Sequence, residues 1–587
     1  MPALHRRLPA ATRIGKAGRR RLEPPQQRLD TFDVFETVLV RAVSPPHAIF
    51  FLVGQQARDE GLITCSAHAF DKARQAAERR AARARADEMD LSDIYAELGG
   101  ALGLPDAVQQ RLAELELSEE VAQLRPLPSG AAMVAESRAR TGRVVYVSDM
   151  YLPADFIQQQ LERHGLWQDG DALYVSLAHG CTKQGGGLFA VVAAAEGVPV
   201  EVIRHHGNHL QSDVRGAQRA GAVPVLLADG NPNRFEQALE RHRDATDGLT
   251  AAMSGASRLA RLELAPSSGR DRALVDVAAG VMAPVLTDYV LWLLRRAQAL
   301  GLKRLYFVAR DGQVLLRIAE RLAPRIGCDV ELRYLYASRL VWNRVVSGPS
   351  RNPQVWNSLV GLSSGGIGNR DVLERTGIGP DEVERVVAAS GLDAERWRSA
   401  TDRTALLAAL EQIEANGTLA AAATRNKVLV MRHLEQEGLL DGVPHGFVDV
   451  GWRGTQHDAL VELQTERGAL PAHGLFFGLD SSASTLGHLR EAYFFDSRGR
   501  SVGEAPDSLL PLGGSYLPRT RLGTPIGPAD FALVEVFCSG DEGTVTDFAA
   551  TPEGVVPVLV PGRREAVEAW GLPWSGARST ATCDTLP

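Results

Sequence analysis

The stretch LDTFDVFETVLV, residues 29–40, carries the clearest structural signal in the N-terminal half of the chain. Its first apolar and β-branched residues predict a short buried strand that ends at Asp33. In an open parallel sheet, ligands bind beyond the carboxyl ends of the strands, so a carboxylate at this position is a candidate catalytic group. Phe35 and Glu36 follow it, and Thr37 lies four residues on. The stretch therefore predicts a candidate catalytic carboxylate at a strand end.

Length and composition limit what the chain can be. A chain of 587 residues is several times the usual domain length and predicts two or more domains. The 64 basic and 71 acidic side chains give a net charge of −7, unlike a nucleic-acid-binding surface. Five scattered cysteines fit a reducing cytoplasm better than a disulfide framework or a zinc site. We therefore expect a cytoplasmic protein that binds a small-molecule substrate and no nucleic acid, and a homo-oligomer is compatible with this composition.

The most apolar stretch is VDVAAGVMAPVLTDYVLWLL, residues 275–294. It is interrupted by Asp276, Pro284 and Asp288, which disfavour a segment that crosses a bilayer. It predicts a buried helix and no membrane span.

Alternating patterns along the chain predict an α/β protein. After residue 28, apolar β-type runs alternate with segments of helical period, which implies a parallel sheet covered on both faces. A helical insert between the first two strands would form a cap, and a stretch with Gly and Ser separates the two halves. The expected organisation is a disordered basic arm (1–27), an α/β domain (28–240) with a cap insert (46–140), a linker (241–268), a second α/β domain (269–560) and a tail (561–587).

Four short motifs follow one another along the first half. They are FDVFETVL with Asp33, YVSDMYL with Ser148, CTKQGGGLF with Lys183, and HHGNHLQSDVRGAQRAG with Asp213. In order and spacing they resemble the four motifs of the haloacid dehalogenase (HAD) superfamily, over residues 28 to about 230. The resemblance implies a Rossmannoid domain with the helical insert as its cap, and hydrolase activity, most often on phosphate esters.

The chemistry of these side chains agrees with the roles that the resemblance implies. Asp33 can attack phosphorus to form an aspartyl-phosphate. Ser148 can donate a hydrogen bond to phosphoryl oxygens, and Lys183 can neutralise their charge and keep Asp33 ionised. Magnesium takes oxygen ligands, and the candidates are Asp33, the backbone carbonyl of Phe35, Asn208 and Asp213. Further candidates for substrate binding are Thr37, Asp149 and Gly207.

Two positions depart from the phosphatase pattern of the family. Phe35 stands where most members have an aspartate that protonates the leaving group, and Asn208 replaces a metal-binding carboxylate, so metal affinity should fall. A missing general acid costs about two to four orders of magnitude in rate unless the leaving group is a stable anion. Glu36 or a nearby histidine is a candidate substitute acid. Because adjacent strand residues point to opposite faces, we expect His206 to face the site and His205 to pack away from it.

Three functions remain open from the sequence. The first is a HAD-like phosphatase or phosphotransferase that acts through an aspartyl-phosphate on a small phosphorylated metabolite or sugar. The second is a metal-independent dehalogenase-type hydrolase, because an aromatic at position 35 and a neutral residue at position 208 are similar to that subgroup. The third is a non-catalytic, ligand-binding component of a biosynthetic pathway. We rank phosphoryl chemistry first.

The second half contains YFVARDG, YASR and DVGWRGT. These stretches resemble the C-terminal region of predicted bacterial hydrolases of the same superfamily, and the resemblance implies no role for them. Arg310, Arg339 and Arg453 suit an anionic ligand, and the backbone amides of DVGWRGT are placed to cradle a phosphate. The simpler alternative is that Asp311 and Asp449 cap helices and pair with these arginines.

Overall fold

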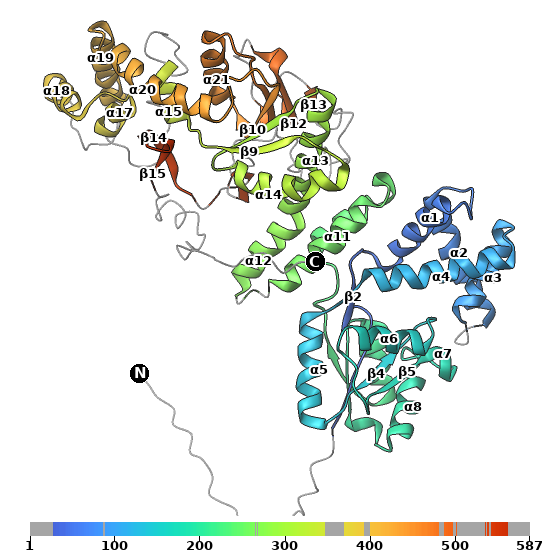
Figure 1. The fold of residues 1–587 in the computed structure, drawn as a ribbon. Helices are drawn as coiled ribbons and strands as arrows, with labels where there is room; N and C mark the ends of the chain where they lie inside the picture. Colours follow the sequence, from blue (N-terminus) through green and yellow to red (C-terminus); the bar gives the residue numbers. More distant parts are fainter. Residues whose placement is uncertain are drawn as a thin grey trace, which may run out of the picture. The chain divides into compact units, whose positions relative to one another are not determined.

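The structure is a computed structural model, and two compact units, Met1–Pro232 and Asn233–Pro587, make up the chain. Figure 1 shows the elements of each unit. The arm predicted at 1–27 and the tail predicted at 561–587 lie outside the described residues. The structure describes 28–85, 89–264, 266, 268–346, 369–391, 400–479, 486–496, 500–501, 534–535, 537–538, 540 and 542–560.

Five parallel strands form the sheet of the first unit. Their order is β5-β4-β1-β6-β7, so β1 lies between β4 and β6. Thr31 of β1 pairs with Val145 on one side and with His205 on the other, which brings three of the four sequence motifs to neighbouring strand ends. The strands are β1 (Leu29–Phe32), β4 (Val145–Ser148), β5 (Ala172–Val175), β6 (Ile203–Gly207) and β7 (Val223–Leu226).

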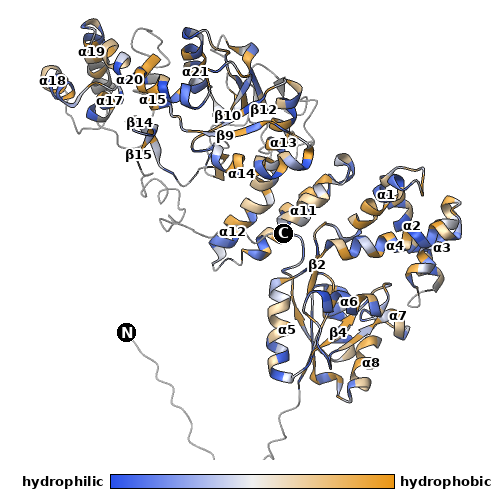
Figure 2. Cartoon of the chain, viewed as in Figure 1, coloured by the Kyte–Doolittle hydropathy of each residue, from blue (hydrophilic) through white to orange (hydrophobic). Residues whose placement is uncertain are grey.

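Helices alternate with these strands along the chain. One apolar core forms where Val145 and Val147 of β4 and Ile203 of β6 pack with Leu188 and Phe189 of α8. Figure 2 shows hydrophobic and hydrophilic residues alternating along the helices, as expected for elements with one face on a sheet. The helices are α5 (Pro128–Thr141), α6 (Ala154–Arg163), α7 (Ser176–His179), α8 (Gly187–Glu196), η3 (Val200–Val202), η4 (Leu210–Arg215) and α9 (Gly216–Ala220).

A helical cap is inserted between β1 and β4. Two short strands, β2 (Leu39–Arg41) and β3 (Leu124–Pro126), pair antiparallel where the chain enters and leaves it. The sequence placed the end of the insert at residue 140, but the cap helices end at Gln123, because α5 after them packs against β1 of the sheet. The cap contains η1 (Pro46–Ala48), α1 (Ile49–Asp59), α2 (Ala67–Arg85), α3 (Leu91–Leu102) and α4 (Asp106–Gln123).

The segment predicted as a linker, 241–268, is mostly helical instead. It contains η5 (Asp244–Thr246) and α11 (Leu249–Glu263), preceded by α10 (Arg234–Glu240). Three of the small residues that suggested a linker, Ser254, Gly255 and Ser257, lie buried on α11, where small side chains allow close helix packing against α10 and η6 (Ala278–Met282). Low hydrophobicity here reflects tight packing of small residues.

The second unit is built on a mixed sheet. Its order is β13-β12-β11-β10-β8-β9, and every pair is parallel except β12 with β13. The strands are β8 (Arg304–Val308), β9 (Glu331–Leu335), β10 (His445–Trp452), β11 (His473–Leu479), β12 (Arg490–Asp496) and β13 (Arg500–Ser501). Its helices include α12 (Gly269–Val277), α13 (Ala283–Ala299), α14 (Gly312–Leu322), η7 (Ala323–Ile326), α15 (Arg339–Val346) and α21 (Thr455–Glu466). The prediction of two α/β domains with parallel sheets is confirmed.

A group of helices with its own core is inserted between β9 and β10. Val372, Leu373, Leu406 and Leu410 are among its buried residues. Its members are α17 (Asn369–Arg375), α18 (Pro380–Ser390), α19 (Ala400–Ala415) and α20 (Thr418–Gln436). Further along the chain are η8 (Gly487–Leu489) and the hairpin β14 (Thr544–Thr551) and β15 (Gly554–Val560), which packs on α20.

Helices α12, η6 and α13 run on as one apolar stretch, Gly269–Ala299. Within the described ranges it is the one helix long and apolar enough to cross a membrane, and 72% of its most apolar window is buried in the structure. Tyr289, Trp292 and Leu293 of α13 belong to the core beneath the sheet. A core helix of this kind meets the same criteria of length and hydropathy.

Candidate active site

Asp33 lies at the carboxyl end of β1, the middle strand of the first sheet. Its backbone N–H donates to the carbonyl of His206 at 2.8 Å, which continues the pairing with β6. The side chain is 7% exposed. Its Oδ1 accepts a hydrogen bond from Lys183 Nζ at 2.5 Å, and its Oδ2 accepts one from Thr37 Oγ1 at 3.1 Å. Thr37, predicted to bind substrate, therefore orients the carboxylate.

Lys183 joins two carboxylates in the centre of the site. Its buried Nζ lies 2.5 Å from Asp33 Oδ1 and 2.7 Å from Asp213 Oδ1. Burial opposes the ammonium, but Asp33 and Asp213 outweigh it and raise the pKa of Lys183. Burial, reinforced by the charge of Asp213 and opposed by Lys183, raises the pKa of Asp33 to about 7. One lysine thus serves two acids whose pKa values are shifted in opposite directions, upward for Asp33 and downward for Asp213.

Both carboxylate oxygens of Asp213 have polar partners. Its Oδ1 lies 3.3 Å from His205 Nε2, and its Oδ2 accepts from the backbone N–H of His209 at 2.8 Å. Although burial opposes ionisation, Lys183 and the hydrogen bond with His205 lower the pKa of Asp213. Gly207, predicted to bind substrate, makes room for it, because a Cβ there would lie 2.4 Å from Asp213 Cγ.

The histidine pair on β6 is oriented opposite to the prediction. His205 pairs with Thr31 and shares its face of the sheet with Asp33, and its Nδ1 lies 2.9 Å from Thr31 Oγ1. Burial lowers the pKa of His205 to about 4, so its neutral ring donates from Nε2 to Asp213 and accepts at Nδ1. His206 stacks on Phe32 on the other face. The sequence shows that His205 and His206 point to opposite faces of the sheet. It does not show the register between β1 and β6, which determines which of the two shares a face with Asp33.

Ser148 is the last residue of β4, the strand next to β1, and Asp149 follows it. Phe32 pairs with Tyr146, so the buried Ser148 lies at the end of the neighbouring strand. Asp149, predicted to bind substrate, accepts hydrogen bonds from the backbone N–H groups of Lys183 and Gln184 at 2.8 and 3.3 Å. Asp149 therefore anchors the loop that carries Lys183.

Phe35 and Glu36 occupy the turn after Asp33. Glu36 has a positive φ of 55°, and its Oε2 lies 3.1 Å from Arg41 Nη1. Arg41, at the end of β2, also lies 4.6 Å above the Phe35 ring and binds both carboxylate oxygens of Glu120 on α4. The carboxylate predicted as a substitute acid is thus engaged by the arginine at the cap entrance, a poor arrangement for proton donation.

A second buried ion pair joins the cap to the loop after Ser148. Arg74 of α2 donates to both oxygens of Glu116 on α4 at 2.8 and 2.7 Å. Tyr151, three residues after Ser148, donates to Glu116 at 3.0 Å, and Tyr95 of α3 donates to it at 2.7 Å. Sequence analysis missed Arg41, Arg74 and Glu116, and their only signal is the unusual number of charges in an otherwise amphipathic insert.

Asp213 and Asn208, two of the predicted magnesium ligands, are engaged with neighbouring groups of the chain in this structure. Both oxygens of Asp213 accept hydrogen bonds, and Lys183 supplies the positive charge between the two carboxylates. The amide of Asn208 is engaged as well, since Oδ1 accepts from Thr37 at 3.3 Å and Nδ2 donates to Asn231 at 2.7 Å. Among the described residues, no group of three or more His, Cys, Asp or Glu side chains is placed to hold a metal.

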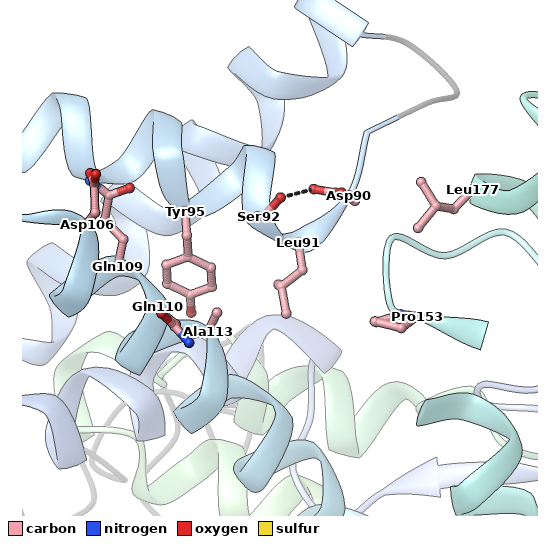
Figure 3. A pocket seen from close by; sticks show the side chains of 10 residues that line it. All are labelled: Asp90, Leu91, Ser92, Tyr95, Asp106, Gln109, Gln110, Ala113, Pro153 and Leu177. Carbon is pink, nitrogen blue, oxygen red and sulfur yellow. Dashed lines mark hydrogen bonds between the residues drawn. The ribbon is translucent and has the colours of Figure 1, made fainter. Parts of the chain in front are cut away.

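A cavity of about 560 Å³ lies between the cap and the core of the first unit. Figure 3 shows Leu91 and Tyr95 of α3 on one side and Pro153 and Leu177 of the core on the other. Pro153 lies five residues after Ser148, so the cavity adjoins the loop at the carboxyl end of β4. The remaining lining residues are Asp90, Ser92, Asp106, Gln109, Gln110 and Ala113.

The other two predicted substrate-binding residues belong to the second unit. Arg310 follows β8, and Arg453 precedes α21; both side chains are exposed. The structure therefore assigns them to a different sheet from Asp33.

Comparison with known proteins gives likeness of fold only for the first part of the chain. No family model matches the chain. No curated protein matches it either. Among solved structures, a 2-haloacid dehalogenase from Pseudomonas syringae is 17% identical, with 35% of this chain and 88% of that chain covered and a TM-score of 0.27.

Two further solved structures are similar over the same share of the chain. A predicted phosphoglycolate phosphatase from Haemophilus somnus is 13% identical, with 35% of this chain and 86% of that chain covered and a TM-score of 0.25. A HAD-hydrolase, YfnB, from Bacillus subtilis, solved bound to magnesium, is 16% identical, with 35% and 90% covered and a TM-score of 0.27.

Proposed function

We propose that the first unit is a HAD-like hydrolase in which Asp33 attacks the substrate and forms a covalent intermediate. The observation that carries the proposal is the Lys183 bridge, with Nζ 2.5 Å from Asp33 and 2.7 Å from Asp213 at the carboxyl ends of adjacent strands. A buried ammonium lowers the cost of ionising Asp33 and attracts the negative groups of a small anionic substrate. Water then hydrolyses the intermediate and regenerates the carboxylate.

The surroundings of Asp33 restrict the leaving group. Phe35 carries no proton to donate, and the Glu36 carboxylate is engaged by Arg41. A leaving group that is stable as an anion needs no protonation, whereas an alkoxide does. We therefore rank an acyl phosphate above a sugar phosphate as the substrate, with an aspartyl-phosphate as the intermediate.

A second candidate is halide displacement from carbon, with an aspartyl ester as the intermediate. The specific observation in its favour is that Asp213 is engaged by Lys183, His205 and His209, which leaves the predicted magnesium ligand set incomplete. Halide leaves as a stable anion, so this chemistry also tolerates Phe35. Both candidates use the same nucleophile.

The test is turnover by the full chain of three substrates: acetyl phosphate, a glucose phosphate and a chlorinated carboxylic acid, each with magnesium and with a chelator. We expect phosphate release from acetyl phosphate to exceed release from the glucose phosphate. Chloride release that is insensitive to the chelator would select the second candidate. If the folded protein turns over none of the three, the hydrolase proposal is wrong and ligand binding alone remains.

A further inference from the structure

The second sheet has a topological switch point between β8 and β10. From β8 the chain passes to β9 on one side of it, and later returns to β10 on the other side. In open parallel sheets, ligands bind in the crevice beyond the carboxyl ends of the two strands at such a point. Phe307 of β8 pairs with Val448 of β10, which fixes which loops meet there.

Charged residues follow β8 and β9, and a further one, Asp449, lies within β10 just past its pairing with β8. Asp449 comes directly after Val448, the last β10 residue paired with β8. Asp311 lies three residues beyond the end of β8, and Arg310 precedes it. Arg339 begins α15, four residues beyond the end of β9. The sheet order therefore gathers two acids and two arginines around the switch point.

These side chains do not have the structural roles that would explain them. Asp311 occupies the N-cap position of α14, yet its side chain makes no capping hydrogen bond. Asp449 Oδ1 accepts from the backbone N–H of Gly451 at 3.2 Å, and the N-cap of α21 is Gly454. Within the part of the chain that the structure describes, the side chains of Asp311, Arg310 and Arg339 make no hydrogen bond or ion pair. The alternative of capping and mutual pairing is therefore wrong for these residues.

The two acids are also electrostatically unsatisfied. Burial, then the charges of Asp311 and Glu535, raise the pKa of Asp449 to about 7, with Arg339 opposing. Burial and Glu535 raise the pKa of Asp311 to about 6, with Arg310 and Arg339 opposing. Hydrogen-bond donors from a ligand would relieve this strain on the carboxylates.

The mixture of charges selects the kind of ligand. Two arginines at the rim repel a bare metal ion, and two half-buried carboxylates repel a bare phosphate. A molecule that carries hydroxyl donors at one end and an anionic group at the other satisfies both sets. The amino ends of α14 and α21, which are 11 and 12 residues long, point to the same edge and favour the anion.

We propose that this edge is a second ligand-binding site, for a polyhydroxylated anion such as a sugar phosphate. Asp311 and Asp449 accept hydrogen bonds from its hydroxyl groups, and Arg310 and Arg339 bind its phosphate. The site is independent of the chemistry at Asp33.

The experiment is hydrogen–deuterium exchange of the full chain with a glucose phosphate, glucose or inorganic phosphate as the probe. The Asp33→Asn background prevents turnover, and peptides over 309–313 and 449–455 report on this edge alone. We expect the glucose phosphate to protect both peptides. Glucose alone and inorganic phosphate alone should each bind at least about tenfold more weakly. In Asp311→Asn and in Arg339→Gln, binding of the glucose phosphate should weaken at least about tenfold.

Asp329→Asn is the matched control, because Asp329 is an exposed acid that precedes β9, at the opposite edge of the same sheet. It should bind the glucose phosphate as the parent does. The proposal is overturned if the glucose phosphate protects neither peptide, or if Asp311→Asn and Arg339→Gln bind it unchanged. Equal binding of inorganic phosphate and the glucose phosphate would overturn the role of the carboxylates.

Discussion

The two sheets present similar edges and use them differently. In each sheet the first strand along the chain lies between two later strands, β1 between β4 and β6, and β8 between β10 and β9. Each edge also holds an aspartate whose pKa is raised to about 7, Asp33 in the first and Asp449 in the second. At the first edge Lys183 lies between Asp33 and Asp213, and every carboxylate oxygen has a partner. At the second edge Arg310 and Arg339 oppose the raised pKa of Asp311 through their charge, and Arg339 does the same for Asp449. Under the two proposals above, the first edge carries out a reaction and the second binds a ligand.

The largest effect expected is on the nucleophile. Asp33→Asn should reduce turnover by at least about a thousandfold, because an amide cannot form the covalent intermediate. Asp449→Asn makes the same change at the second edge and should leave turnover of the preferred substrate near the parent value. Steady-state rates for both variants at equal folded fraction test this. Comparable losses in the two variants would show that the edges act together.

Removal of a cap carboxylate tests what holds the first edge in place. Glu116→Gln leaves Arg74 buried without its counter-charge and should lower the free energy of unfolding by about 3 kcal/mol. Chemical denaturation measures it. The control Glu60→Gln breaks an exposed pair with Arg111 and should leave unfolding unchanged. An unchanged midpoint for Glu116→Gln would mean that the cap does not depend on this pair.

The pH dependence of turnover tests whether the raised pKa of Asp33, and not that of Asp449, controls the reaction. Asp33 must be ionised to attack, so kcat/KM should rise about tenfold per pH unit up to about pH 7 and then level off. Its folded pKa lies above its ordinary value of 3.8, so its contribution to stability is present at low pH and lost as pH rises through about 7. Asp449→Asn should not move the profile. A profile that is flat from pH 5 to 8 would contradict the assignment of the proton to Asp33.

The smallest effect expected is an increase in the rate of sugar phosphate cleavage. Phe35→Asp places an acid two residues after the nucleophile and should speed cleavage of a glucose phosphate by about tenfold, less than a full general-acid effect. Arg41, which lies 4.6 Å above the Phe35 ring, is close enough to attract the new carboxylate and limit the gain. Phe35→Asn, which has a similar shape and no proton to give, is the control. Equal rates in the two variants would mean that protonation is not what limits the sugar phosphate.

Sequence patterns predicted the sheets because a parallel strand is a short apolar run whose end is marked by a polar residue. Asp33, Ser148, Lys183 and Asp213 were found in this way, and the structure brings Asp33, Lys183 and Asp213 into direct contact. The predictions that were wrong concerned features that depend on strand register or on side-chain packing. The choice between His205 and His206 follows from the alignment of β6 with β1.

The helix α11 shows the second kind of failure. Its Gly and Ser residues are typical of linkers, and only their burial against neighbouring helices makes them helical. The roles of Thr37, Asp149 and Gly207 also could not be predicted from the sequence, because each depends on a contact that only the folded chain makes. Thr37 donates to Asp33, Asp149 accepts from the backbone of Lys183, and Gly207 leaves room for Asp213.

The helix α4 has a consequence for anyone who recombines this protein with others. Glu116 and Glu120 stand one turn apart, and they bind Tyr151 of the core loop and Arg41 of β2 respectively. A cap exchanged as residues 46–123 alone would carry two buried acids to a host without these partners. A functional chimera must therefore receive Arg41 and Tyr151 together with the cap. The set of residues to transfer is not one continuous segment of the sequence.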